Sequence, residues 1–125
     1  MPARPIVVNS TPLVAFWSIG RLDILRDLFN EITIPPAVRD EFISAEKETR
    51  RKTLRDETWI RVLAPENPNR RAVYAGLDDG EAQVLVLAEE QNASLVLIDE
   101  HKARRYAERL KLTFFENCRG KITLQ

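Results

Sequence analysis

The stretch Pro5–Pro12, with the sequence Pro-Ile-Val-Val-Asn-Ser-Thr-Pro, decides the fold. Its apolar half is rich in β-branched residues and predicts a short buried strand over 5–8. The polar residues that follow predict the start of a helix, with Ser10 or Thr11 as the N-cap and Pro12 in the first turn. A buried strand that leads directly into a helix is typical of α/β folds.

The rest of the chain repeats this alternation of apolar strands and amphipathic helices. Strands are predicted at 32–34, 59–63, 94–98 and 112–115, and helices at 12–19, 22–29, 37–44, 77–91 and 101–110. Gly20 and Asn92 are expected to end two of these helices. The charged segment 45–57 is compatible with a surface helix, and a polar tail follows the last strand. The pattern predicts a single domain over 1–125, of a three-layer α/β/α fold, with a mainly parallel central sheet and 59–63 at its edge.

The composition excludes several kinds of chemistry. With 44% hydrophobic and 30% charged residues, and 19 acidic against 19 basic side chains, the chain has an ordinary globular composition. One cysteine, Cys118, and one histidine, His101, are too few for a zinc cluster, an internal disulfide or most serine–histidine catalysis. No apolar stretch is long enough to span a bilayer, and no secretion signal is recognisable, so we expect a cytoplasmic protein without membrane contact. Its chemistry must then depend on carboxylates.

Four oxygen-bearing side chains stand at positions that an α/β fold brings together: Asn9, Glu41, Glu81 and Asp99. In open parallel sheets, ligands bind beyond the carboxyl ends of the strands, where Asn9 and Asp99 directly follow two predicted strands. Two carboxylates about 4 Å apart repel each other by roughly 4 kcal/mol at an effective dielectric constant of 20. A hard cation such as Mg²⁺ or Mn²⁺ converts this repulsion into binding, and supplies an activated water for attack on a phosphodiester.

Each of these residues also has a purely structural interpretation. Glu81 stands three residues after Asp78, which is the spacing of a capping box. Asp99 precedes a predicted helix and is a candidate N-cap. Glu41 is compatible with a solvated position on a helix, and Asn9 with a turn in which it bonds to its own backbone. The argument for a metal site therefore depends on the four residues together.

Two basic clusters and two tryptophans also have alternative interpretations. The cluster over 50–55 and the one that includes Arg104 and Arg105 are candidates for contacts with the phosphates of RNA. The alternative is that both clusters are solvated helix faces with neighbouring glutamates as partners. Trp17 and Trp59 are interpreted as core residues, with the alternative that they anchor a partner.

Four segments resemble the motifs of PIN-domain proteins, in the same order and at similar spacing. They are Val7–Val14, Ile34–Glu41, Leu77–Ala82 and Leu95–Asp99. The resemblance extends from about Ile6 to Phe115. Within it, 20–23 and 79–82 are similar to a prokaryotic branch that includes VapC-like toxins.

The resemblance implies a specific fold and activity. It implies a central parallel sheet with strand order 3-2-1-4-5 and cleavage of single-stranded RNA that depends on Mg²⁺ or Mn²⁺. The implied catalytic acids are Glu41, Glu81 and Asp99, which would hold the metal together with Asn9. Ser10 or Thr11 would orient a ligand or a water. Many relatives form homodimers and act as the toxin beside a small antitoxin protein.

Asn9 is a departure from the usual pattern, because it offers a neutral carbonyl oxygen where most relatives carry an aspartate, although asparagine also occurs in this branch. Two hypotheses follow. The chain is a metal-dependent ribonuclease, or it is a catalytically weakened PIN domain that binds RNA or a protein. A flavodoxin-like or receiver-like module is disfavoured, because the chain has no glycine-rich phosphate loop and no lysine in the expected context.

Overall fold

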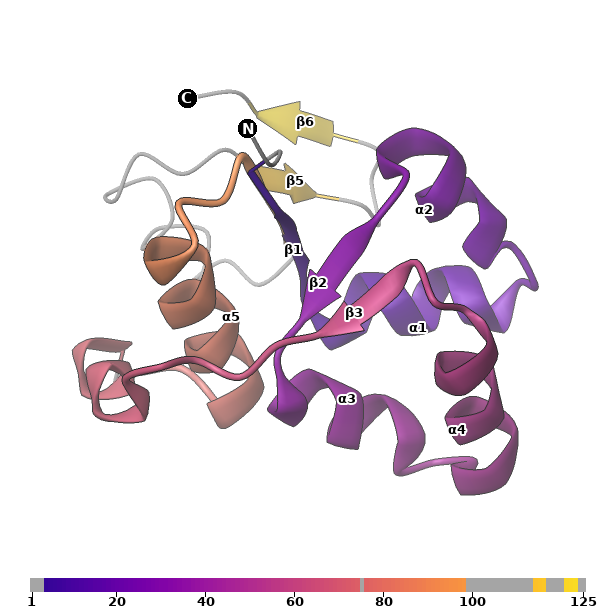
Figure 1. The fold of residues 1–125 in the computed structure, drawn as a ribbon, viewed down its shortest axis with the longest axis horizontal. Coiled ribbons are helices and arrows are strands. Elements are labelled where there is room, and N and C mark those ends of the chain that lie inside the picture. Colours follow the sequence, from indigo (N-terminus) through magenta and orange to yellow (C-terminus); the bar gives the residue numbers. More distant parts are fainter. Residues whose placement is uncertain (1–3, 75, 99–113, 117–120, 124–125) are drawn as a thin grey trace.

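Six short strands form one sheet in the computed structural model, which describes residues 4–74, 76–98, 114–116 and 121–123. The strands are β1 (Ile6–Val8), β2 (Ile32–Ile34), β3 (Ile60–Val62), β4 (Leu95–Leu97), β5 (Phe114–Glu116) and β6 (Lys121–Thr123). Their order across the sheet is β3-β2-β1-β4-β5-β6 (Figure 1). The first five are parallel, and β6 is antiparallel to β5.

The strand β1 lies in the middle of the sheet, between β2 and β4. Val7 and Val8 have no exposed surface, and their backbones pair with Thr33 of β2 and with Leu97 of β4. A strand with neighbours on both edges and covered faces must be apolar throughout, which is the composition of Ile6–Val8. This burial explains why β1 is the clearest strand in the sequence.

The predicted α/β fold with strand order 3-2-1-4-5 is confirmed, and β3 lies at the edge as expected. The prediction of a polar tail is wrong for Lys121–Thr123, which form β6 beside β5. Three residues are too few to show a strand periodicity, so only pairing with a neighbour reveals them. The predicted helix over 101–110 lies outside the described residues.

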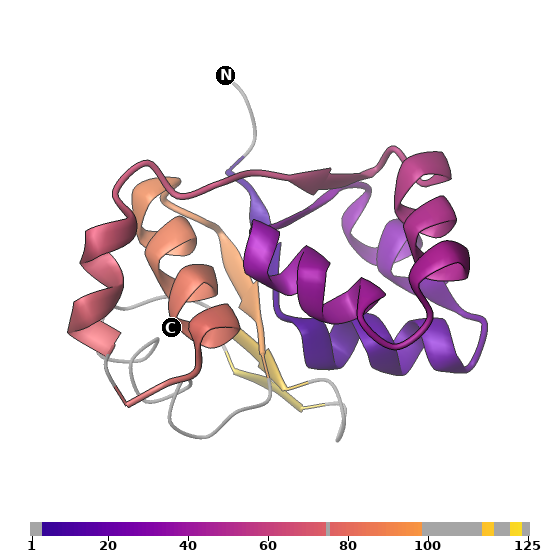
Figure 2. The same cartoon turned by 90° about the horizontal axis from the view of Figure 1, so that it is seen from below.

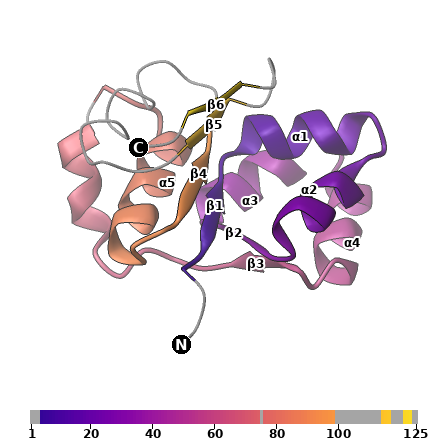
Figure 3. The same ribbon diagram turned by 90° about the horizontal axis from the view of Figure 1, so that it is seen from above.

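Helices cover both faces of the sheet. They are α1 (Ser10–Ser18), α2 (Leu22–Phe29), α3 (Pro36–Ile43), α4 (Lys47–Asp56), the 3₁₀ helix η1 (Pro68–Tyr74) and α5 (Asp79–Glu90). Seen from above, α1, α2 and α4 lie on one side of the sheet, and α5 and η1 on the other (Figure 3). Within the described ranges, no helix has the length and apolar character needed to cross a membrane.

The helix ends follow the sequence signals with one exception. Gly20 ends α1 with a positive φ of 69°, and the amides of Gly20 and Arg21 bond to the carbonyls of Trp17 and Phe16, as in a Schellman motif. The prediction of Ser10 or Thr11 as the N-cap of α1 is wrong. The N-cap is Asn9, whose backbone is extended and whose side chain does not cap the helix.

The helix η1 lies where the sequence pattern predicts neither a helix nor a strand, and one carboxylate of α5 holds it in place. Glu89 of α5 accepts hydrogen bonds from Arg70 at 2.7 Å and from the buried Tyr74 hydroxyl at 3.0 Å. The hydrogen bond from Arg70 lowers the pKa of the Glu89 carboxyl, and that from Tyr74 contributes in the same direction. These bonds join η1 to the C-terminal part of α5, whereas the site described below lies at the N-terminus of that helix.

A buried arginine joins α4 to α1 and α3. The guanidinium of Arg50 lies 4.4 Å from the ring centroid of Trp17 and 5.1 Å from that of Phe42, and its Nη1 donates to the Phe42 carbonyl at 2.8 Å. Arg50 is 8% exposed and forms no ion pair with the described carboxylates. The ring faces and the carbonyl therefore offset part of the cost of its burial, while its Nε is buried without a hydrogen-bond partner among the described residues. The expectation that Arg50 shares a surface cluster with its neighbours is wrong, and Trp17 packs against the core as interpreted.

We predict that Arg50→Ala lowers the free energy of unfolding by about 2 to 4 kcal/mol, because it removes two cation–π contacts and a charged hydrogen bond. The matched control is Arg51→Ala, which removes an exposed arginine from the same helix and should change stability by less than about 0.5 kcal/mol. Urea titrations of both variants measure the difference. Equal losses would contradict the assignment of Arg50 to the core.

Candidate functional site

The candidate site lies at the carboxyl edge of the sheet, where β1 and β4 end side by side. The amide of Asn9 donates to the carbonyl of Leu97 at 3.0 Å, so the two strands stay paired up to their last residues. Seen from below, α3 lies between α4 and the beginning of α5, with α1 next to it (Figure 2). The starts of α1 and α5 therefore meet α3 at this edge.

Asn9 contributes a buried oxygen that has no partner in the described part of the chain. The residue is 4% exposed, and its Oδ1 accepts no hydrogen bond there. Leaving such an atom unpaired costs about 1 to 3 kcal/mol, and most buried side-chain oxygens are therefore paired. The unpaired oxygen of Asn9 is consistent with a ligand at this position.

Glu41, on α3, is held by the first residue of α1. The hydroxyl of Ser10 is buried and donates to Glu41 Oε2 at 2.8 Å. This bond directs the carboxylate toward the end of β1 and leaves Oε1 turned toward Gly80. Thr11, the other residue predicted to orient a ligand, is exposed and forms no side-chain hydrogen bond with the described residues.

Gly80, in the first turn of α5, leaves the space in which three oxygen atoms meet. A Cβ on Gly80 would lie 3.0 Å from Glu41 Oε1, 3.6 Å from Asp78 Oδ1 and 4.0 Å from Asn9 Oδ1. These atoms come from α3, from the N-cap of α5 and from the N-cap of α1. Three residues distant in the sequence thus surround one small space that a side chain at position 80 would fill.

Asp78 and Glu81 form the capping box that was the structural alternative for Glu81. Asp78 Oδ1 accepts from the Glu81 amide at 2.8 Å, and Glu81 Oε1 accepts from the Asp78 amide at 3.1 Å. A role for Glu81 as a metal ligand stays a prediction, since a carboxylate that caps a helix retains further lone pairs. The sequence marks Asp78 only as a helix cap and does not place it beside Glu41. Gly80, two residues after Asp78, is the available signal.

Three predicted site residues lie outside the described residues: Asp99, Arg104 and Arg105. Their roles remain predictions. What the structure describes is the approach to Asp99, because β4 is paired with β1 over its whole length and the buried Ile98 follows it. The chain therefore reaches position 98 beside Asn9.

The oxygen atoms around Gly80 suit a hard cation. The described residues contain no group of three His, Cys, Asp or Glu side chains placed to hold a metal, so Glu41, Asp78 and Glu81 do not form one among themselves. The three oxygens lie 3.0 to 4.0 Å from the position that a Cβ on Gly80 would occupy. An ion at that position would therefore be farther from them than the roughly 2.1 Å of direct Mg²⁺ coordination. Mg²⁺ usually keeps several waters, which bridge such gaps between the ion and side-chain oxygens.

The starts of two helices add positive potential to this site. The N-caps of α1 and α5, Asn9 and Asp78, both place an oxygen near Gly80, so the first turns of both helices begin there. Unpaired amides at a helix start favour anions, including phosphate. The arrangement thus combines oxygen ligands for a cation with amides that favour a phosphate.

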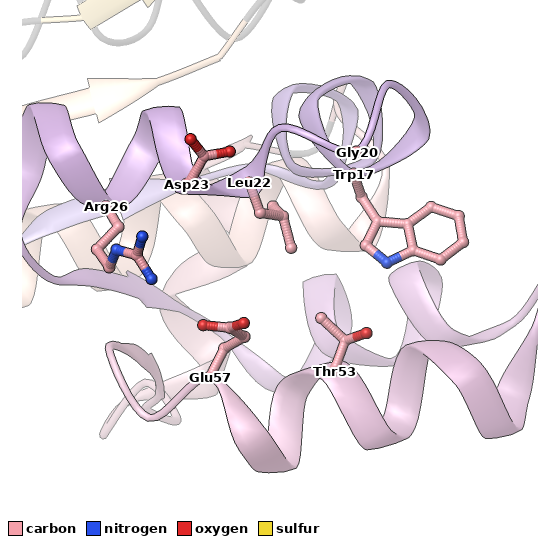
Figure 4. Close-up of a pocket in the computed structure, with 7 residues that line it drawn as sticks. All are labelled: Trp17, Gly20, Leu22, Asp23, Arg26, Thr53 and Glu57. Atoms are coloured by element: carbon pink, nitrogen blue, oxygen red, sulfur yellow. The ribbon is translucent and has the colours of Figure 1, made fainter.

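A separate hollow of about 270 Å³ lies between α2 and α4, away from this edge (Figure 4). Its lining includes Trp17, Arg26 and Glu57, and Asp23 at its rim is already bonded to Arg21 at 3.1 Å. Trp59 packs against the hydrophobic core, and its Nε1 donates a hydrogen bond to Glu57, which is one of the lining residues. In the described chain, no buried unpaired oxygen or nitrogen belongs to this lining. The hollow therefore lacks the features that mark the Gly80 site.

A family model described as PIN domain matches residues 5–116. The matched range begins just before β1 and ends with β5, so it includes every element of the candidate site. No curated protein matches the chain.

We predict that Gly80→Ala separates stability from ion binding. Alanine favours a helix over glycine by up to about 1 kcal/mol, so the free energy of unfolding should hold or rise. The added Cβ would displace Glu41 Oε1, and we expect Mn²⁺ affinity to fall roughly tenfold or more. Calorimetric Mn²⁺ titration and thermal unfolding measure the two effects. Gly76→Ala is the control, because a Cβ there meets nothing within 4 Å; unchanged Mn²⁺ binding in a stable Gly80→Ala protein would contradict the site.

Proposed function

The chain belongs to the PIN-domain family, and on that premise we propose that it is a metal-dependent endoribonuclease that hydrolyses phosphodiester bonds of single-stranded RNA. PIN domains have a nuclease-type fold and generally bind nucleic acid, and PIN nucleases generally use divalent metal ions. The finer assignments, to RNA, to Mg²⁺ or Mn²⁺ and to particular residues, are our proposal.

One observation supports this proposal above the others. Asn9 Oδ1 is buried and has no partner in the described part of the chain, and it lies with Glu41 Oε1 and Asp78 Oδ1 around the space over Gly80. An unpaired oxygen beside two carboxylates is unfavourable unless a cation or a donor binds between them. The site also lies at the sheet edge where parallel α/β proteins bind ligands.

We assign the metal site to Asn9, Glu41, Glu81 and Asp99, with Asp78 as an additional carboxylate. A bound divalent cation would supply charge stabilisation and a water of lowered pKa. Ser10 would keep Glu41 in place through its hydrogen bond, so that the carboxylate does not have to be ordered when substrate binds. The starts of α1 and α5 would hold the phosphate by their amides. Hydrolysis then adds one water across a P–O bond, with the proton passing to the leaving oxygen.

The biological setting proposed for this activity follows the resemblance to the VapC-like branch. We propose a toxin that acts on single-stranded RNA in the cytoplasm, is neutralised by a small antitoxin protein and forms a homodimer. The similarity of 20–23 and 79–82 to that branch supports this setting, as does the single cysteine, which suits a reducing compartment.

A second function is favoured by Asn9 itself. An amide in place of a carboxylate removes one negative charge from the site and weakens its attraction for a cation. The alternative proposal is therefore a catalytically weakened PIN domain that binds RNA or a protein without cutting. The first function predicts that RNA is cut in the presence of metal, whereas the second predicts that it stays intact.

We predict that the natural chain cuts single-stranded RNA in excess Mn²⁺, and that Glu41→Gln or Asp99→Ala lowers the rate roughly 100-fold or more. Chelation should abolish cleavage in the natural chain. The control is Glu46→Gln, which neutralises an exposed glutamate at the start of α4 that makes no capping bond. Gel analysis of labelled RNAs of diverse sequence provides the measurement. If purified protein leaves all of them uncut, the ribonuclease proposal fails.

We predict that Asn9→Asp raises Mn²⁺ affinity about tenfold or more, since a carboxylate about 4 Å from a unit positive charge gains roughly 1 to 4 kcal/mol. Asn69→Asp, at an exposed position of η1, is the control for the change in net charge. Calorimetric titration measures affinity, and the cleavage assay is run in parallel. Activity that appears only in Asn9→Asp would identify the weakened domain. Unchanged affinity would show that residue 9 does not face the ion.

A further inference from the structure

The outer face of α4 carries three cationic side chains around a shallow hollow. Arg51, Lys52 and Arg55 line a depression of about 620 Å³ together with Glu48 and Thr49. All three cationic residues are exposed, and their spacing along the helix places them as neighbours on one face. The preceding Arg50 is turned inward onto Trp17 and does not belong to this face.

These three cations differ from several other arginines of the described chain in having no partner there. Several exposed arginines elsewhere are paired with carboxylates, as in Arg21–Asp23 at 3.1 Å, Arg61–Glu31 at 3.5 Å and Arg70–Glu89 at 2.7 Å. Within the described chain, Arg51, Lys52 and Arg55 form neither an ion pair nor a side-chain hydrogen bond. Like charges at this spacing repel each other unless an anion lies between them.

We propose that this face of α4 binds the phosphate backbone of single-stranded RNA and extends the substrate track of the nuclease. The inference rests on the proposed function for the identity of the polyanion. Guanidinium groups bind phosphate oxygens in pairs, and an ammonium group adds a point charge, so two arginines and a lysine suit successive phosphates. Such contacts strengthen binding without selecting a base sequence.

The cationic face is continuous with the helix that carries Glu41. Arg51 also lines a second hollow of about 330 Å³, between α3 and α4, together with Arg39, Asp40 and Ile43 of α3. Glu41 follows Asp40 on that helix, and α3 lies between α4 and the beginning of α5 (Figure 2). A strand bound on α4 would therefore pass over α3 to reach the site at Gly80.

The same face lacks the features of a docking site for a protein segment. The large hydrophobic side chains exposed among the described residues are Ile19, Leu28, Val62, Leu63 and Val73, and none of them lies on α4. Protein interfaces usually contain an apolar core, whereas nucleic-acid interfaces are polar and positively charged. The chemistry of the α4 face favours RNA.

The test measures binding of a labelled single-stranded RNA by fluorescence anisotropy, in EDTA so that no cleavage occurs. The variant is Arg51→Gln/Lys52→Gln/Arg55→Gln, and the control is Arg21→Gln/Arg61→Gln/Arg70→Gln, which removes the same charge from paired arginines. Loss of three phosphate contacts should reduce the slope of log K against log salt by about 2. Between 50 and 200 mM salt, the affinity of the variant should therefore fall by a factor about 20 times smaller than that of the natural chain. Glu48→Gln should tighten binding, because it removes the acid from this face.

An unchanged slope in the α4 variant, or an equal effect in the control, would overturn the proposal. It would also be overturned if the α4 variant kept its RNA affinity but lost binding to a labelled acidic peptide. Binding and cleavage fail separately in this design. With saturating RNA and Mn²⁺, the α4 variant should keep the natural rate and show only a raised KM. If the natural chain binds RNA through α4 but never cuts it, the α4 proposal holds and the ribonuclease proposal fails.

Discussion

The pairing of β1 with β2 and β4 is the constraint on which the site depends. Because β1 has neighbours on both edges, its residues cannot slide without breaking two ladders of hydrogen bonds. The ladder with β4 extends to the bond between the Asn9 amide and the Leu97 carbonyl. Asn9 is therefore held at the carboxyl edge, and α1 has to begin there. Ser10 follows directly, which explains how a hydroxyl in α1 reaches a carboxylate in α3.

Two residues of the site give up local stability that other choices would provide. Asn9 occupies an N-cap, where asparagine normally bonds to the first turn of its helix, yet its side chain makes no such bond. Gly80 stands in the first turn of α5, where alanine is the better helix former. Departures of this kind from local preference are expected at functional sites. Both residues leave room or a free oxygen at the same point.

The sequence predicts the elements whose residues repeat a pattern, and it misses those defined by a single contact. β1 and β4 are evident because both faces are buried, and Gly20 because few other residues adopt its positive φ. Arg50 is indistinguishable from Arg51 in the sequence, since only the packing of α4 against the rest of the molecule decides which of them turns inward. Asp78 and Glu41 are far apart in the chain, so their approach depends on how α3 packs against α5. Gly80, two residues after Asp78, is a local sign of a close approach there, but it does not identify Glu41 as the residue that approaches.

The stacking of Arg50 on Trp17 has a consequence for the alignment of α4 with the rest of the molecule. Arg50 and Arg51 are identical residues in succession. A one-residue slip of this helix would therefore place Arg51 on the rings of Trp17 and Phe42, at little cost in free energy at that contact. Leu54, one turn later, packs against the core, and a slip would replace it with Arg55. The two aromatic rings thus hold an arginine but do not distinguish Arg50 from Arg51. Leu54 fixes the register of α4, so that Arg51, Lys52 and Arg55 stay exposed to water.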